Sequence, residues 1–464
     1  MSHSRSFLAT SPYHHSVGTQ SVLDAYDEGG EPLEPVRESK AHGQIDISEF
    51  GTFRESKAAP IHRWFQYPAG FSFRGVDYVL ALNHIGREHR VYDPFTGTGT
   101  TEVVCKGRGI SSGGTEAHPF VARIARTKVR WDYDMENLRK TSDEFLRDLR
   151  GRVEDYRDVS LEDVPELVRK CYSPNNLRKL ILIRELIKER VPEDYRDLFD
   201  VAVIGTLRRA SAAATGWPYI APKVQIEEKD GLETFCLQLD ECVRDLMSTP
   251  REVRGTPSDI VEGDSRHSPF EEESFDFAFT SPPYLNNYDY GDRTRLESYF
   301  MGFAATWGEI STKVRDRLIV SATTQIGRTD YETKDIICPE LKLAEPRLAT
   351  LIQGKVDLLS DLRDRKDGRK SYDIMVGQYF NDMTLSIKDT LRVLKPGAKC
   401  ALILGDSAPY GVHIPTEEYL GQIGCGLGFK RYSVIQMRTR GDKWKANPQR
   451  HRVALRESLL VLEK

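Results

Sequence analysis

Several features of membrane, secreted and metal-binding proteins are missing from this 464-residue chain. No apolar run approaches the roughly 20 residues that span a membrane, and residues 1–8 lack the apolar centre of a secretory signal. The seven cysteines form no Cys-x-x-Cys pair and no zinc-ligand spacing, so we expect reduced thiols, no metal and a cytoplasmic location. The net charge of −4 gives no global attraction to nucleic acid, so any such surface must be a local basic patch.

The stretch that organises the chain is Thr280-Ser281-Pro282-Pro283-Tyr284, which follows an apolar run at 275–279 that predicts a buried strand. Two prolines end the strand and fix a stiff turn. The turn holds a small polar residue and an aromatic ring at the strand's carboxyl end, where open α/β sheets bind ligands. Oxygens here can accept the hydrogens of an exocyclic amino group while Tyr284 stacks on its flat ring. A rigid turn with a buried tyrosine is the plainer reading of these residues alone.

A Gly-rich turn lies earlier in the chain, in Asp93-Pro94-Phe95-Thr96-Gly97-Thr98-Gly99-Thr100. A short strand at 90–93 leads into it and Thr100 can open a helix, so backbone N–H groups can approach a ligand closely. A second strand at 109–115 ends in Glu116, a carboxylate suited to ribose hydroxyls, although it could also be a solvated strand-end charge. No Gly-Lys-Ser or Gly-Lys-Thr follows, which disfavours phosphate binding, but a dinucleotide stays open.

The remaining chain divides into a sheet-forming part and two insertions. We expect a catalytic domain at 46–131 and 251–464, a mobile arm at 1–45, a helical insertion at 132–250 and a second helix-rich insertion at 291–375. Within the catalytic domain, a strand at 258–264 ends in Asp264. The later elements predicted are a helix at 379–394 ended by Lys395-Pro396-Gly397, and strands at 398–405, 429–437 and 457–462.

Two basic stretches are candidates for contact with nucleic acid. The first contains Arg208 and Arg209, beside an aromatic turn that could equally be a packed connection between helices. The second is a loop between the last two predicted strands, for which a solvated hairpin is the alternative. Its candidate residues are Arg438, Arg440, Lys443, Trp444, Lys445 and Arg450.

With these motifs in order, residues 61–130 and 255–464 resemble the S-adenosylmethionine-dependent amino-methyltransferases of DNA. The resemblance implies a Rossmann-like, seven-stranded class I methyltransferase sheet with helical insertions. It assigns catalysis to Ser281, Pro282, Pro283 and Tyr284. Phe71 would lie in the segment that closes over the cofactor's methionine end, Glu116 would hold the ribose, and Asp264 would reach the adenine. The cofactor-binding set is Phe71, Asp93, Pro94, Phe95, Thr96, Gly97, Gly99, Thr100, Glu116, Asp264 and Thr280.

The serine before Pro-Pro-Tyr resembles the cytosine-N4 enzymes, whereas the adenine-N6 enzymes more often have Asp or Asn there. The expected activity is therefore N4 methylation of a cytosine flipped out of double-stranded DNA, within a restriction or other defence system. The cofactor loop precedes the catalytic motif, which departs from the permuted order of many cytosine-N4 enzymes. Either insertion could therefore read the target.

Other functions remain as alternatives. The same motifs fit a DNA adenine-N6 methyltransferase, an RNA guanine-N2 methyltransferase or a non-catalytic DNA-binding subunit. A carbon-5 cytosine methyltransferase is excluded, because that family places its nucleophilic cysteine after a proline and none of the seven cysteines follows one.

Overall fold

The computed structural model describes residues 46–67, 70–215, 220–326, 333–365, 370–440 and 453–464. The predicted arm at 1–45 lies outside these residues. Among the helices described, none is both long and apolar enough to cross a membrane.

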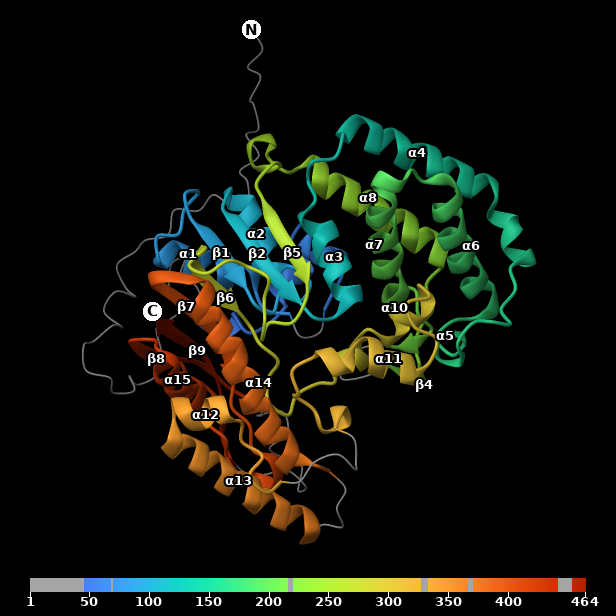
Figure 1. Cartoon of the computed structure of the whole chain (residues 1–464). Helices are drawn as coiled ribbons and strands as arrows, with labels where there is room; N and C mark the ends of the chain where they lie inside the picture. The colour runs from blue at the N-terminus through green and yellow to red at the C-terminus, as the bar shows by residue number, and fades with distance from the viewer. Residues whose placement is uncertain (1–45, 68–69, 216–219, 327–332, 366–369, 441–452) are drawn as a thin grey trace.

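A seven-stranded sheet forms the centre of the molecule, with strand order β5-β2-β1-β6-β7-β9-β8 (Figure 1). The first five strands in this order are parallel, and β9 runs antiparallel to both of its neighbours. The predicted α/β, Rossmann-like class of fold is therefore confirmed. The strands are β1 Arg90–Asp93, β2 Ser111–Glu116, β5 Ser258–Glu262, β6 Phe275–Thr280, β7 Leu394–Gly405, β8 Arg431–Arg440 and β9 Leu455–Glu463.

Helices cover both faces of the sheet, because successive side chains of each strand point to opposite faces. On β7, Ala401 and Ile403 pack on one face, whereas Leu402 and Leu404 pack on the other. The first face lies against α1 and α2, and the second lies against α13, α14 and α15. These helices are α1 Phe73–Leu82, α2 Thr100–Arg108, α13 Pro346–Arg365, α14 Tyr372–Val393 and α15 Thr416–Leu427.

Strand β7 begins earlier than the sequence predicts. Leu394 already pairs with Phe275 of β6, so the Lys395-Pro396-Gly397 stretch lies inside the strand and not before it. The register shifts between Phe275 and Phe277, and Gly397 has a φ of 79°. The proline and glycine therefore occupy an irregular part of the pairing, as expected for these residues in a sheet.

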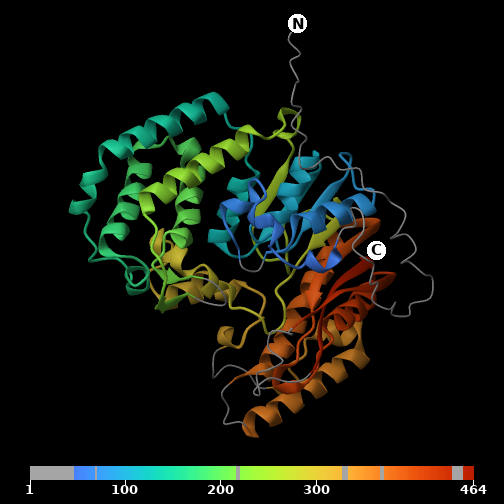
Figure 2. The ribbon, with the colours of Figure 1, turned by 180° about the vertical axis from the view of Figure 1, so that it is seen from behind.

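The segment 132–250 is helical and packs at the β5 edge of the sheet, as Figure 2 shows from behind. It meets the sheet through α3, Pro119–Val129, whose Phe120 and Ile124 share one apolar cluster with this segment. The other elements of the segment are α4 Met135–Gly151, α5 Glu166–Arg169, α6 Pro174–Arg190, α7 Glu193–Arg209, the strand pair β3 Ala213–Ala214 and β4 Ala221–Gln225, and α8 Gly231–Met247.

The segment 291–375 divides between two parts of the molecule. Its helix α10 packs against α5 and α7, whereas α12 and α13 pack against α14. Figure 1 shows the same division, with α10 and α11 beside the helical segment and α12 and α13 below the sheet. The helices are α9 Tyr290–Arg293, α10 Arg295–Phe300, α11 Trp307–Lys313 and α12 Pro339–Ala344.

Candidate active site

Most of the predicted catalytic and cofactor residues follow the carboxyl ends of β1, β2, β5 and β6. Strands β1 and β6 are neighbours in the sheet. The chain leaves β1 towards β2 and β5 on one side, and then returns to β6 on the other side. This is the point at which the strand order reverses, where a crevice opens in sheets of this kind. The Gly-rich loop after β1 and the Pro-Pro turn after β6 therefore meet.

Asp93 joins these two loops from beneath. Its Oδ1 accepts hydrogen bonds from Phe95 N at 2.9 Å and from Thr280 Oγ1 at 2.6 Å. The carboxylate is fully buried, and burial raises the pKa of Asp93 to about 6. Its Oδ2 has no hydrogen-bond partner among the described residues. Gly97 and Gly99 take φ values of 54° and 81°, so the loop needs glycine at both positions.

A first cavity, here called the loop pocket, opens above the Gly-rich loop. Most of the predicted cofactor residues line it, whereas Asp93, Gly99 and Thr280 lie outside its lining. The predicted residues that line it are Phe71, Pro94, Phe95, Thr96, Gly97, Thr100, Glu116 and Asp264. Tyr67, from the segment 62–71 that the resemblance predicts to close over the cofactor, also lines it. Sequence reasoning missed Tyr290, His118 and the run Arg317-Leu318-Ile319, which line it as well.

Glu116 is the carboxylate on which the loop closes. Its Oε2 accepts from Gly97 N and its Oε1 from His118 N, each at 2.8 Å. Burial raises the pKa of Glu116 to about 7, because removing the carboxylate from water disfavours its charge. His118 stays neutral, since burial lowers its pKa to about 3, and its Nε2 lies 2.6 Å from Thr294 Oγ1.

Asp264 is held by a neighbouring guanidinium. Arg266 Nη2 lies 2.7 Å from Asp264 Oδ2, and Arg266 Nη1 lies 2.7 Å from Asp382 Oδ1. These two carboxylates raise the pKa of Arg266, so its charge is secure. Asp264 therefore presents a carboxylate of fixed orientation to the loop pocket.

The Pro-Pro turn separates the loop pocket from a second, larger cavity. Ser281 lines both cavities and donates from Oγ to the carbonyl oxygen of Ile403 at 3.3 Å. Pro283 faces the loop pocket, while Pro282 and Tyr284 face the larger cavity. Ser281 is thus one of the residues that can touch ligands in both cavities, and Tyr67, Gly70, Phe71 and Tyr290 also line both.

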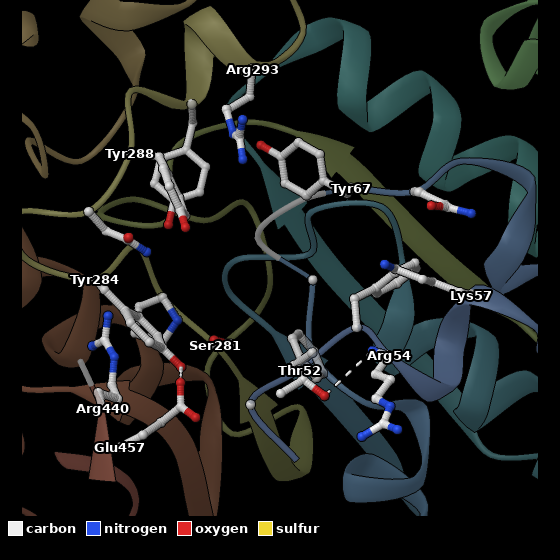
Figure 3. Close-up of a pocket in the computed structure, with 18 of the residues that line it drawn as sticks. Thr52, Arg54, Lys57, Tyr67, Ser281, Tyr284, Tyr288, Arg293, Arg440 and Glu457 are labelled. Carbon is white, nitrogen blue, oxygen red and sulfur yellow. Dashed lines mark hydrogen bonds between the residues drawn. The ribbon is translucent and has the colours of Figure 1, made fainter. Parts of the chain in front are cut away.

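Tyr284 is held by Glu457 of β9, the last strand of the chain (Figure 3). Its hydroxyl donates to Glu457 Oε1 at 3.1 Å, and Arg438 Nε donates to Glu457 Oε2 at 2.5 Å. Burial and the Glu457 charge raise the pKa of Tyr284 well above its usual value, so the phenol remains protonated. Sequence reasoning missed Glu457, although an acid in an apolar strand is a usable signal for a buried partner.

The second cavity, here called the basic cleft, has a volume of about 960 Å³. Its walls combine the segment after residue 50, the end of α7 and the ends of β7, β8 and β9, and Figure 3 shows Thr52, Arg54 and Lys57 across from Tyr284. Among the described residues, two carboxylates line it, Asp406 and Glu457. The cationic residues that line it are Arg54, Lys57, Arg63, Arg208, Arg209, Arg293, Arg438 and Arg440.

The predicted nucleic-acid residues fall into three groups. Arg209, Arg438 and Arg440 line the basic cleft. Arg208 also lines it, but its guanidinium pairs with the buried Glu297 and donates to the carbonyl oxygen of Thr215 at 3.0 Å, which gives it a structural role. Lys443, Trp444, Lys445 and Arg450 lie outside the described residues.

Several proteins are similar to this chain over most of its length. Type II methyltransferase M.BsoBI of Geobacillus stearothermophilus is 24% identical over 460 residues, which cover 89% of this chain and 87% of that protein. Type II methyltransferase M.MvaI of Kocuria varians is 22% identical over 395 residues, with coverages of 80% and 82%. Type II methyltransferase M.AvaI of Anabaena variabilis is 22% identical over 461 residues, with coverages of 89% and 88%. No profile of an established protein family matches the chain. The resemblance to methyltransferases is thus confirmed.

Proposed function

We propose that this chain is a site-specific DNA methyltransferase that acts on the N4 amino group of a cytosine flipped out of double-stranded DNA. The observation that carries the proposal is the position of Ser281 in the wall shared by the loop pocket and the basic cleft. A methyl donor in one cavity and a base in the other would meet at this residue. The type II methyltransferases that resemble the chain over most of their length support the methyltransferase part of this assignment.

The loop pocket suits S-adenosylmethionine through its chemistry. It offers carboxylate acceptors in Glu116 and Asp264 and apolar walls in Phe71 and Ile319. Arg317 is the one cationic side chain among the described residues that line it, and it pairs with Glu262 at 3.0 Å. Acceptors without a free cation favour a nucleoside over a phosphorylated nucleotide. When bound there, the cofactor supplies an electrophilic methyl group on a sulfonium.

The Pro-Pro turn would then act on the amino group of the base. The amino nitrogen of cytosine is a poor nucleophile, because its lone pair is delocalised into the ring. The hydroxyl of Ser281 and the carbonyl oxygens of Ser281 and Pro282 can accept the two amino hydrogens and localise that lone pair. Tyr284 would hold the angle of the ring by stacking. Such positioning can account for much of a rate enhancement without a covalent intermediate.

The basic cleft would receive the DNA. Its excess of cationic side chains is local, since the whole chain has a net charge of −4, and matches the phosphate backbone. Ile204, Gly205 and Arg209 bring the segment 132–250 to the cleft wall, whereas Arg293 is the residue that the described part of 291–375 contributes. We therefore favour the segment 132–250 over 291–375 for reading the target.

Methylome sequencing of a host expressing the chain tests the proposal, with a Ser281→Ala host as the matched control. We expect N4-methylcytosine at one recurrent site, present with the wild type and lost with the variant. Digestion of the same DNA to nucleosides identifies the methylated base independently. If N6-methyladenine is the only modified base found, the target base is adenine and not cytosine. Transfer of a labelled methyl group to RNA alone would favour an RNA methyltransferase. Cofactor binding without any methyl transfer would favour a non-catalytic DNA-binding subunit.

A further inference from the structure

The ring on which the target base would stack is already covered. The guanidinium carbon of Arg440 lies 5.0 Å from the centroid of the Tyr284 ring, a cation–π contact. Tyr284 is only 9% exposed although it lines the basic cleft. Figure 3 shows the Arg440 side chain alongside the ring, on the side of the cleft formed by Glu457.

The surroundings of the ring show which group can move. Tyr284 follows a stiff Pro-Pro turn, and its hydroxyl is tied to Glu457. The backbone of Gly405 approaches the ring as well, so a Cβ at this position would lie 3.1 Å from Tyr284 Cδ2 and would collide with Arg440. Arg440, at the end of β8, carries the long and flexible side chain of this group. A base therefore gains access to the ring by displacing Arg440.

We propose that Arg440 caps the Tyr284 ring in the DNA-free protein and competes with the target base for it, an inference that rests on the function proposed above. A planar guanidinium can stack on an aromatic ring, and it can also form paired hydrogen bonds with phosphate oxygens. The Arg440 side chain can therefore leave the Tyr284 ring and bind a phosphate group. When a base enters, Arg440 moves to the phosphates beside the flipped nucleotide. Arg440 is thus a positioning residue that makes every base compete before it reaches Ser281.

The test separates competition at the ring from contact with phosphate. Methyl transfer is measured with duplex DNA containing the target site, and with free deoxycytidine and deoxyadenosine, which carry no phosphate. For Arg440→Ala we expect kcat/KM for the accepted nucleoside to rise about three- to tenfold, since the cation–π contact no longer competes. The value for duplex should fall, because a phosphate contact is lost. Arg440→Lys, which keeps the charge but loses the planar group, should give a smaller rise.

Arg54→Ala is the matched control, because Arg54 lines the same cleft on the opposite wall and has no contact with the Tyr284 ring in Figure 3. It should lower transfer to duplex without raising transfer to nucleoside. The affinity of each variant for the cofactor, which is proposed to bind in the separate loop pocket, shows whether that variant is folded.

The outcomes distinguish this inference from the proposed function. If the wild type transfers no methyl group to DNA, the proposed function fails. Suppose that the wild type is active on duplex DNA but Arg440→Ala transfers methyl groups to the nucleoside no faster than the wild type. The proposed competition between Arg440 and the base is then refuted, also when neither nucleoside rate is measurable. A lower nucleoside rate in Arg440→Ala would show that Arg440 stays and supports the base.

Discussion

Replacing Glu116 by glutamine should remove a pH dependence of cofactor binding. In the protein without ligand, burial raises the pKa of Glu116 to about 7. The carboxylate must be ionised to accept two ribose hydroxyls while it also accepts from Gly97 N and His118 N. Affinity is therefore present above this pKa and is lost as the pH falls through it. Glutamine has nearly the same size as the protonated acid and does not titrate in this range.

The magnitude follows from the ionised fraction. With a pKa of about 7, about 90% of Glu116 is ionised at pH 8 and about 10% at pH 6. The dissociation constant of the wild type should thus rise about tenfold between these two values. At pH 8, loss of the charged acceptor should weaken binding by about 10- to 100-fold, from the strength of hydrogen bonds to charged groups. At pH 6 the two proteins should differ about tenfold less.

Calorimetric titration of the demethylated cofactor into both proteins at several pH values measures this effect. The amine of the ligand titrates identically in both experiments, so the ratio of the two dissociation constants isolates Glu116. Asp93, with its pKa raised to about 6, is intact in both proteins. Thermal melting shows whether the Gly-rich loop tolerates the amide. A ratio that stays constant from pH 6 to pH 8 would refute the role of Glu116.

Three further predictions concern catalysis and stability. Ser281→Ala should lower kcat by about 10²- to 10³-fold with cofactor affinity nearly unchanged, as measured by single-turnover transfer and titration; loss of cofactor binding would mean that the site is misplaced. Tyr284→Phe, which loses only the bond to Glu457, should retain most transfer while Tyr284→Ala does not; equal losses would show that stacking is not the role of the ring. Burial lowers the pKa of Lys128 from 10.5 to about 7, so the unfolded chain binds more protons between these values and wild-type stability should rise with pH there. Lys128→Met should raise the free energy of unfolding at pH 7 by as much as about 4 kcal/mol, and this gain should shrink toward pH 10 in denaturant titrations; a gain independent of pH would contradict the buried charge.

The fold was predictable from the sequence because its signals are local. An apolar run of strand length leads to Thr280, and the Gly-rich turn lies between two short strands that end in Asp93 and Glu116. Proline follows Asp93 directly and follows Thr280 after one residue. These features also predict most of the loop pocket, since the ends of parallel strands meet at one edge.

The rest of the site depends on contacts that no local pattern encodes. Glu457 reaches Tyr284 because β9 lies beside β7 in the sheet. Ile319 enters the loop pocket from an insertion with no motif of its own. Arg208 is basic and close to an aromatic turn, but its partner Glu297 is 89 residues away and becomes visible only in the folded chain.

The pairing of β2 with β5 has a consequence for how such enzymes can diversify. Glu116 lies opposite Glu262, so the intervening helical segment leaves and rejoins the sheet at adjacent strands. During evolution, another helical unit whose ends lie equally close could replace this segment without breaking the sheet. The replacement would also have to cover Phe120 and Ile124 of α3, which the present segment buries. Change in this helical segment, which we propose faces the DNA, is therefore permitted by the connection but limited by the apolar face beneath it.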